Sequence, residues 1–377
     1  MLHFNNAGAA LSPDQVTAAV IEHLRREQEI GPYEAAAAAA DELEKFYSEM
    51  AKLLGCRAEE IAFIENATRA WDLALYAVDL QAGDEILTAR NEYASNYLGL
   101  LHLARQRGLS ITVIDSDDDG LIDLEALERS ISPRSRLIAL THIASQRGDI
   151  QPAAEVGEIA HRHGLLYLLD ACQSVGHLRL DVETLQCDFL TGTGRKYLRG
   201  PRGTGFLYVR GSILKDLNPE FVDLHAASWT TAETFNWRPG ASRFEVFERF
   251  VAGQIGLARA VAYANSLGAP AIEARIRALA VRLRQRLFQI RGLRVLERST
   301  NFSGIVTFHC EQIQAEKLQL RLRKEGVNTS VARASGARLD LDREEMQAVS
   351  RASVHYYNSE TEIEGFASKL EDCLGTF

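Results

Sequence analysis

Short apolar segments alternate with helical patterns between residues 60 and 210, and this alternation constrains the fold more than any other feature of the chain. Segments such as "LLYLLDA" at 165–171 are apolar almost throughout, which is typical of strands buried on both faces. Patterns such as "AAEVGEIAHRHG" at 153–164 place apolar residues at helical spacing and end in glycine. The alternation predicts an α/β fold with a mostly parallel sheet covered by helices on both faces. The predicted strands are 60–65, 84–90, 110–117, 135–143, 165–171, 188–194 and 204–210, and the predicted helices among them are 67–81, 94–108 and 153–164.

The pattern changes after about residue 255. Two long helical patterns, at 253–268 and 271–290, precede a mixture of strands and helices that includes "GIVTFHC" at 304–310. This mixture predicts a smaller α+β domain at the C-terminal end. We expect three parts: an N-terminal segment, 1–20, near the active site, a large domain over 21–255, and a small domain over 256–377.

Composition and charge exclude several classes of protein. The chain is 46% hydrophobic and 25% charged, as soluble globular proteins are, and its net charge of -9 argues against a nucleic-acid surface. No apolar run approaches the ~20 residues that span a bilayer, and the first residues lack the pattern of a signal peptide. The five cysteines are scattered without a CxxC pair, which indicates reduced thiols and no zinc site. We therefore expect a cytoplasmic protein without a metal, a membrane partner or a nucleic-acid partner.

A single lysine, Lys196, stands in the run "DFLTGTGRKYLRGPRGTGFLYV" between two predicted strands. Upstream, Asp170 closes the apolar strand "LLYLLD", where a carboxylate is costly unless a cation or hydrogen-bond donors meet it. Ligands of parallel α/β sheets bind beyond the carboxyl ends of the strands. Pyridoxal 5'-phosphate (PLP) needs a lysine for its Schiff base and a carboxylate that keeps its pyridine nitrogen protonated. Lys196 and Asp170 together therefore predict a PLP site.

The phosphate of PLP needs several donors, which a helix N-terminus, hydroxyl groups and a cation supply. The segment "ENATRAW" offers the backbone N–H groups of Ala67 and Thr68 and the Thr68 hydroxyl at the start of a predicted helix. Thr68 alone would be read as an ordinary helix N-cap. Thr193 and Arg195, beside the lysine, complete the predicted phosphate site.

The segments "DACQSVGH" and "DFLTGTGRKYLRGPRGTG" resemble the cofactor signature of the class V aminotransferase family, the fold-type I PLP enzymes that include cysteine desulfurases. "FNNAGAALSP", "NEYASN", "THIASQRGDIQP" and "RASVHYYNSETEI" resemble further family segments in the same order along the chain. The resemblance implies a large domain with a seven-stranded type of sheet and a homodimer with its active site at the interface. The small-molecule substrate that it implies is an amino acid.

The resemblance also implies roles for individual residues. Lys196 would form the Schiff base and move the proton at the substrate Cα, and Asp170 would pair with the pyridine nitrogen. Tyr93 would stack on the ring, in the place of a histidine of the cysteine desulfurases, and is counted with the catalytic residues. The other residues assigned by resemblance are Gln173 at the ring 3'-oxygen, Ser145 at the flank of the cofactor, Arg351 at the substrate carboxylate, and Asn6 and Ala7 in the substrate loop.

Departures from the family pattern bear on the reaction. Family members that take sulfur from cysteine carry a catalytic cysteine shortly before the carboxylate arginine, and here no cysteine lies between Cys310 and Cys373. "SRFEVFERFVAG" also lacks the segment with which many relatives contact the phosphate of the partner subunit. The chain is more similar to a subgroup with hercynylcysteine sulfoxide lyase, cystine C–S lyases and isopenicillin N epimerase-like proteins. We therefore expect a C–S lyase that releases pyruvate and ammonia by β-elimination, and we expect no persulfide-forming desulfurase.

Alternatives stay open at this point. The same cofactor residues serve an aminotransferase or an amino-acid epimerase, whereas a non-catalytic binding module conflicts with the intact Lys196, Asp170 and Arg351. Substrate identity would depend on short polar or aromatic residues in predicted loops, with Tyr33 and Arg333 as the predicted contacts. The remaining candidates are Asn328 and Ser330 in the same loop as Arg333, and Trp229 and Trp237, for which the mouth of the site and core packing are both open.

Overall fold

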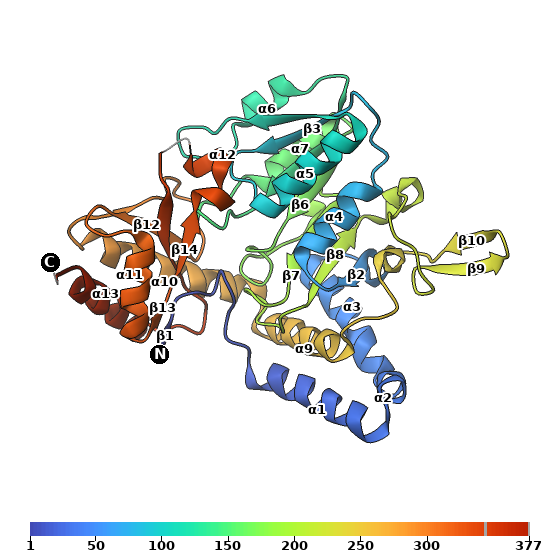
Figure 1. The fold of residues 1–377 in the computed structure, drawn as a ribbon, viewed down its shortest axis with the longest axis horizontal. Helices are drawn as coiled ribbons and strands as arrows, with labels where there is room; N and C mark the ends of the chain where they lie inside the picture. The colour runs from blue at the N-terminus through green and yellow to red at the C-terminus, as the bar shows by residue number, and fades with distance from the viewer. Residues whose placement is uncertain (343–344, 376–377) are drawn as a thin grey trace.

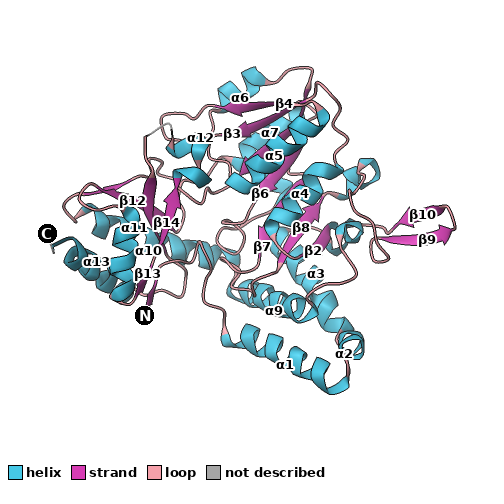
Figure 2. Cartoon of the chain, in the orientation of Figure 1, coloured by secondary structure: helices cyan, strands magenta, loops and turns pink. Residues whose placement is uncertain are grey.

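The computed structural model describes residues 1–342 and 345–375, and a twisted seven-stranded sheet lies at its centre (Figures 1 and 2). The strand order is β2-β8-β7-β6-β5-β3-β4, and β8 is the strand that runs antiparallel to both its neighbours. The mostly parallel sheet predicted from the alternating pattern is therefore confirmed. The seven strands are β2 (Ile61–Ile64), β3 (Glu85–Ala89), β4 (Ser110–Ile114), β5 (Ser135–Thr141), β6 (Leu166–Asp170), β7 (Phe189–Thr193) and β8 (Gly205–Val209).

Helices cover both faces of this sheet because its strands are apolar on both sides. In β6, Leu168 packs into the core under α4 and α5, whereas its neighbour Leu169 packs into the core under α3, α7 and α9. Successive strand residues point to opposite faces of the sheet, so a strand that is apolar throughout must be covered on both faces. The helices of this part are α1 (Asp14–Ile30), α2 (Pro32–Ala38), α3 (Ala40–Leu54), α4 (Ala67–Ala77), α5 (Ala94–Arg107), α6 (Leu124–Ser130), α7 (Ala153–Arg162), α8 (Val182–Leu185) and α9 (Val251–Leu267), with 3-10 turns at η1 (Ala58–Glu60), η2 (Gly211–Asp216) and η3 (Ala241–Phe244).

A second, antiparallel sheet forms the small part of the molecule, with the order β11-β12-β15-β14. Its core contains Ile276 and Leu283 of α10, Leu318 of α11 and Phe366 of α13. The predicted α+β character of this part therefore agrees with the structure. Its elements are α10 (Ala269–Phe288), β11 (Leu293–Val295), β12 (Ile305–Cys310), α11 (Ala315–Lys324), β13 (Val327–Asn328), β14 (Ser330–Arg333), η4 (Ala334–Gly336), α12 (Arg338–Leu341), β15 (Ala348–Ser353) and α13 (Glu360–Gly375).

Two of the predicted domain boundaries can be compared with the packing of the helices and strands around them. The limit at residue 255 falls inside α9, which packs on α3 and α1 of the large part and ends at Leu267, with Gly268 as its C-cap. The start of the chain crosses to the small part, where β1 (Leu2–His3) pairs with β13 and Phe4 stacks on Phe366 with ring centroids 4.7 Å apart. The division into domains stays a prediction, and the packing of α9 favours a boundary near Gly268.

A hairpin of β9 (Ala227–Thr231) and β10 (Thr234–Trp237) projects from the large part, at the right of Figure 1. It carries Trp229, whose side chain is 72% exposed. Trp229 therefore does not pack in the core of this chain. Among the described helices, none combines the length and the apolar composition that a membrane crossing requires.

Candidate active site

A cavity of about 350 Å³ opens beyond the carboxyl ends of β5, β6 and β7, next to the first turns of α4 and α5. This is the edge of a parallel sheet at which the fold class places ligands. The cavity is lined by all nine residues predicted from the sequence to hold the cofactor, namely Ala67, Thr68, Tyr93, Ser145, Asp170, Gln173, Thr193, Arg195 and Lys196. These residues are separated by as many as 129 positions in sequence, from Ala67 to Lys196, so the topology of the sheet brings them together.

Lys196 lies on the tight loop that joins β7 to β8, and its side chain is buried. The loop is closed by a hydrogen bond from the Gly200 N–H to the Gly194 carbonyl oxygen, 2.7 Å long. A side chain at Gly194 would bring its Cβ within 2.2 Å of the Thr204 hydroxyl, so this position requires glycine. Burial lowers the pKa of Lys196, and the nearby charges of Arg195 and Arg351 lower it further. A lysine with a lowered pKa is a better nucleophile at neutral pH.

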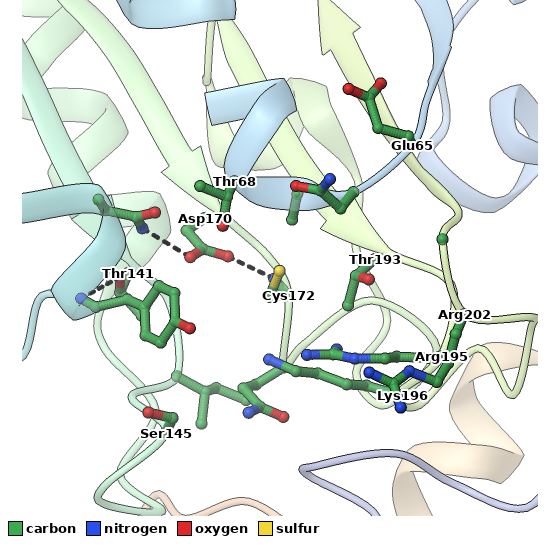
Figure 3. Close-up of a pocket in the computed structure, with 17 residues that line it drawn as sticks. Glu65, Thr68, Thr141, Ser145, Asp170, Cys172, Thr193, Arg195, Lys196 and Arg202 are labelled. Carbon is green, nitrogen blue, oxygen red and sulfur yellow. Dashed lines mark hydrogen bonds between the residues drawn. The ribbon is translucent and has the colours of Figure 1, made fainter. Parts of the chain in front are cut away.

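Asp170 ends β6 and turns its carboxylate into the cavity, where two donors fix it (Figure 3). The Asn96 side-chain amide donates to Oδ2 at 2.8 Å, and the backbone N–H of Cys172 donates to Oδ1 at 2.7 Å. Gln173 donates from Nε2 to the Ala7 carbonyl oxygen at 3.1 Å, and its buried Oε1 has no hydrogen-bond partner among the described residues. An amide of this kind can present either its oxygen or its nitrogen to a ligand.

One end of the cavity has the donors that an anion requires. Ala67 and Thr68 begin α4, whose N-cap is Asn66: its side chain accepts from the Arg69 N–H at 2.9 Å. Thr68 is therefore not the cap, and its hydroxyl lines the cavity instead. Thr193 adds a second hydroxyl from the end of β7.

Two guanidinium groups lie at the same cavity, from Arg195 and from Arg202 (Figure 3). A helix N-terminus, two hydroxyls and two cations suit a phosphate dianion. Together with the buried lysine, the fixed carboxylate and the unpartnered amide oxygen of Gln173, these groups fit PLP.

Tyr93 lies at the start of α5, where the backbone is extended and the chain enters the helix. Its N–H donates to Glu92 Oε1 at 2.9 Å and to the Thr141 hydroxyl at 3.3 Å. These bonds fix the backbone while the side chain lines the cavity. The position is compatible with ring stacking, which stays a prediction.

Arg351 approaches the cavity from β15 of the small part but does not line it. Its Nε donates to the Ser330 hydroxyl at 2.8 Å, and its Nη1 donates to the Ser145 carbonyl oxygen at 2.6 Å. Because Ser145 lines the cavity, Arg351 lies directly behind the lining. Burial lowers the pKa of Arg351 to about 10, so the guanidinium still carries its charge at neutral pH.

Asn6 and Ala7 are buried behind the cavity rather than at its surface. The Asn6 side chain donates to the Ser353 carbonyl oxygen at 2.7 Å, and the Ala7 carbonyl oxygen accepts from Gln173. Both residues therefore connect the N-terminal segment with the cofactor residues and with β15. Their predicted contact with a substrate stays a prediction.

The other predicted substrate contacts lie away from the cavity. Tyr33 belongs to α2 and is 70% exposed, with its ring centroid 6.5 Å from that of Phe247. Arg333 forms an ion pair with Glu316, with 3.0 Å between Nε and Oε1. Neither residue lines the cavity, and neither do the remaining candidates Trp229, Trp237, Asn328 and Ser330.

Sequence reasoning missed several residues that matter in the structure. The sequence predicts Asn96 only as part of the helix at 94–108, although it stands in "NEYASN" four positions after Glu92. Arg202 lies in "GPRGTG" and is not among the predicted site residues, although a cation in a glycine-rich loop beside a phosphate site is a recognisable signal. Cys172 lines the cavity two positions after Asp170, and burial raises the pKa of its thiol.

Comparison with known proteins agrees with this geometry. The family model described as Aminotransferase class-V matches residues 2–366. A probable cysteine desulfurase of Methanothermobacter thermautotrophicus is 29% identical over 348 residues, which cover 92% of this chain and 87% of that protein. The apo structure of cysteine desulfurase from Thermococcus onnurineus NA1 superimposes with a TM-score of 0.93 at 26% identity and covers 100% of this chain and 95% of that one. The chain therefore belongs to the class V aminotransferase family.

The fold is that of the fold-type I PLP-dependent enzymes, and the cofactor is PLP. A mutant of C-DES with glycine covalently linked to its PLP cofactor has the same fold, with a TM-score of 0.89 at 24% identity and coverage of 98% of this chain and 96% of that one. The predicted cofactor and the predicted class of enzyme, a PLP-dependent lyase, are thus confirmed.

The expected reaction is corrected by the same comparisons. Several relatives, from different organisms, are named cysteine desulfurase or probable cysteine desulfurase. The expectation of β-elimination, and of a chain unsuited to desulfuration, is therefore wrong. It depended on the missing loop cysteine, on the missing segment that contacts the phosphate of the partner subunit, and on the similarity to the lyase subgroup. The missing cysteine does not exclude desulfuration, because another thiol can attack the substrate sulfur in its place.

Proposed function

We propose that the chain is a PLP-dependent cysteine desulfurase, which removes the sulfur of L-cysteine and leaves L-alanine. The observation that carries the proposal is one cavity that combines the buried Lys196, the fixed carboxylate of Asp170 and the neighbouring Arg351, in a chain whose relatives are named cysteine desulfurases. These groups are the ones that an α-amino acid and PLP require. The carboxylate-binding cation lies on the small part, whereas the lysine lies on the large part.

Each residue has a proposed task in the reaction. Bound PLP supplies an electron sink for the pair of electrons released from the Cα–H bond of the substrate. Lys196 holds the cofactor covalently and moves the proton at Cα, for which its lowered pKa suits it. Asp170 holds the proton on the pyridine nitrogen. Arg351 binds the substrate carboxylate and so orients the Cα–H bond.

The phosphate end has a separate task. The phosphate is held by Arg195 and Arg202 together with Thr68, Thr193 and the start of α4. These contacts keep the cofactor in place during the reaction. Tyr93 covers the ring and limits the access of water. These roles do not depend on which amino acid is the substrate.

The sulfur acceptor is an external thiol in this proposal. No cysteine lies between Cys310 and Cys373, and Cys172, which lines the cavity, is kept as a protonated thiol because burial raises its pKa. The acceptor thiolate attacks the cysteine sulfur, the Cβ–S bond breaks, and the sulfur leaves as a persulfide. Carbon Cβ takes up a proton and is reduced, while the acceptor sulfur is oxidised, so L-cysteine and a thiol give L-alanine and a persulfide.

The test is to incubate the PLP-loaded protein with L-cysteine and dithiothreitol and to measure alanine, sulfide and pyruvate together. We expect alanine and sulfide in equal amounts, no pyruvate, and a rate that rises with the concentration of dithiothreitol. Lys196→Ala should abolish the activity, and Cys172→Ala should keep it within about two-fold, since an external thiol accepts the sulfur. Pyruvate in place of alanine, or the absence of both products from a fully loaded protein, would falsify the proposal.

We also propose a cytoplasmic homodimer. Exposed aromatic side chains support the dimer, among them Tyr33 and Phe247, which lie against each other on the large part, and Trp229 on the projecting hairpin. A second copy would cover such side chains, and it would allow Tyr33 to reach a cavity other than that of its own chain. The five cysteines, all unpaired, support a reducing compartment. Light scattering of the purified protein measures the mass, and an active monomer would contradict the dimer.

A further inference from the structure

A second carboxylate, that of Glu92, is buried next to Asp170. Glu92 follows β3, and its side chain is 3% exposed. Its oxygens accept hydrogen bonds from neutral donors: Asn96 Nδ2 at 2.9 Å, the Tyr93 N–H at 2.9 Å and the Thr88 hydroxyl at 3.1 Å, with the Thr141 hydroxyl as a fourth. None of these partners carries a positive charge. A buried carboxylate that is held only by neutral donors costs stability, so its presence calls for an explanation.

Asn96 connects the two carboxylates. Its amide nitrogen donates to Glu92 Oε1 at 2.9 Å and to Asp170 Oδ2 at 2.8 Å. An amide nitrogen has two hydrogens, and both are used here, one for each carboxylate. With Glu92 on one side, the amide cannot turn its oxygen toward Asp170 without placing two acceptors together. Glu92 therefore fixes the orientation of Asn96, and Asn96 fixes the carboxylate of Asp170.

The electrostatic surroundings of Glu92 are also defined. Burial raises the pKa of Glu92 to about 7, the hydrogen bonds from Thr141 and Asn96 oppose this rise, and the negative charge of Asp170 adds to it. Tyr167 of β6 also faces it, and burial keeps the pKa of Tyr167 well above its ordinary value. Tyr167 thus stays neutral, and Asp170 and Glu92 are the two acids of this network.

We propose that Glu92 and Asn96 are positioning residues, which hold the Asp170 carboxylate toward the pyridine nitrogen of PLP. The added negative charge of Glu92 makes the loss of the proton on that nitrogen less favourable. Asn96 provides the geometry, and Glu92 provides both the orientation of Asn96 and the charge. The inference rests on the proposed role of Asp170 and is independent of the substrate.

The experiment uses the substrate-free holoenzyme, and its readout is the pH at which the visible absorbance of the bound cofactor changes. Glu92→Gln keeps an acceptor for Asn96 but removes the charge. Above about pH 7, where Glu92 is ionised, its negative charge raises the pKa of a nearby group that holds a proton. Loss of that charge should therefore lower a titration midpoint in this range by about one pH unit. Asn96→Leu removes the hydrogen bonds that join Glu92 to Asp170. We expect this variant to bind PLP about ten-fold more weakly, so that on dilution it loses the cofactor at about ten-fold higher protein concentration than the wild type.

Glu85→Gln is the matched control. Glu85 is a buried glutamate at the other end of β3, where it accepts from the hydroxyls of Thr112 at 2.6 Å, Ser135 at 2.7 Å and Ser132 at 2.9 Å. Its replacement should lower stability as much as that of Glu92 but leave the midpoint unchanged.

Two outcomes overturn the inference: a wild-type midpoint in Glu92→Gln, or an equal shift in Glu85→Gln. If Glu92→Gln does not fold, Asn96→Leu decides, and wild-type cofactor retention in that variant overturns the inference as well. A failure of the proposed function is distinguishable, because it would show as no alanine from L-cysteine while these titrations keep their differences.

Discussion

The two ends of the candidate site were assembled in different ways. At the ring and phosphate end, the predicted residues line one cavity, and they come from short segments that follow the strands of one parallel sheet. At the substrate end, Arg351 lies behind the lining, and Tyr33 and Arg333 lie away from it. The sheet topology alone brings the first group together. The second group depends on how the N-terminal segment and the small part pack against the large part, which no local pattern specifies.

A stack of rings joins the two ends. His177 lies 4.1 Å from Tyr197, Tyr197 lies 5.2 Å from His355, and His355 lies 5.0 Å from Tyr357, measured between ring centroids. The Arg199 guanidinium covers Tyr357 at 4.4 Å. Tyr197 directly follows Lys196 in the sequence, whereas His355 and Tyr357 belong to the small part. The lysine loop and the small part are therefore in contact through packed rings.

We expect the largest effect on activity from replacing Arg351, which belongs to the substrate end of the site. Arg351→Met should lower kcat/KM for L-cysteine about 100-fold, because a charge-assisted pair with the substrate carboxylate is lost. Arg351→Lys should restore part of the loss, since it keeps the charge without the planar fork. Cofactor absorbance should not change in either variant. Loss of the cofactor from both would show that Arg351 serves the ring end of the site, and the division between the two ends would then be wrong.

Arg202 tests the other end, with an intermediate effect. Arg202→Ala should leave the KM for L-cysteine within about two-fold, whereas retention of PLP, measured by dialysis, should weaken about ten-fold because one of two phosphate cations is removed. Arg136→Ala is a suitable control, since Arg136 pairs with Asp84 at the opposite edge of the sheet, with 3.2 Å between Nε and Oδ1. Equal retention of PLP in both variants would remove Arg202 from the phosphate site.

Much of the fold and of the ring end could be predicted because periodicity and strand ends are local properties. The strand that ends at Asp170 and the glycine-rich loop around Lys196 are readable from neighbouring residues. Asn96 could not be found in this way, because its importance arises from two carboxylates that it touches, one of them 74 positions away. The domain limit predicted at residue 255 falls inside α9, whose residues are mostly buried, and the sequence does not say which neighbours cover them.

We expect the smallest effect from replacing Arg333, and this variant tests whether Arg333 takes part in substrate binding. The side chain of Arg333 is 54% exposed and its partner is Glu316, so the ion pair is a surface pair. Such pairs contribute about 0–1 kcal/mol, and salt screens them. Arg333→Ala should therefore change the KM for L-cysteine by less than about two-fold and the melting temperature by a degree or two. Glu316→Ala is the matched control, because it removes the same pair from the other side. A rise of about ten-fold in KM for Arg333→Ala but not for Glu316→Ala would show that the guanidinium leaves Glu316 to bind the substrate. The small part would then contribute two arginines to the substrate end, and its closure would have to bring β14 to the cavity together with Arg351.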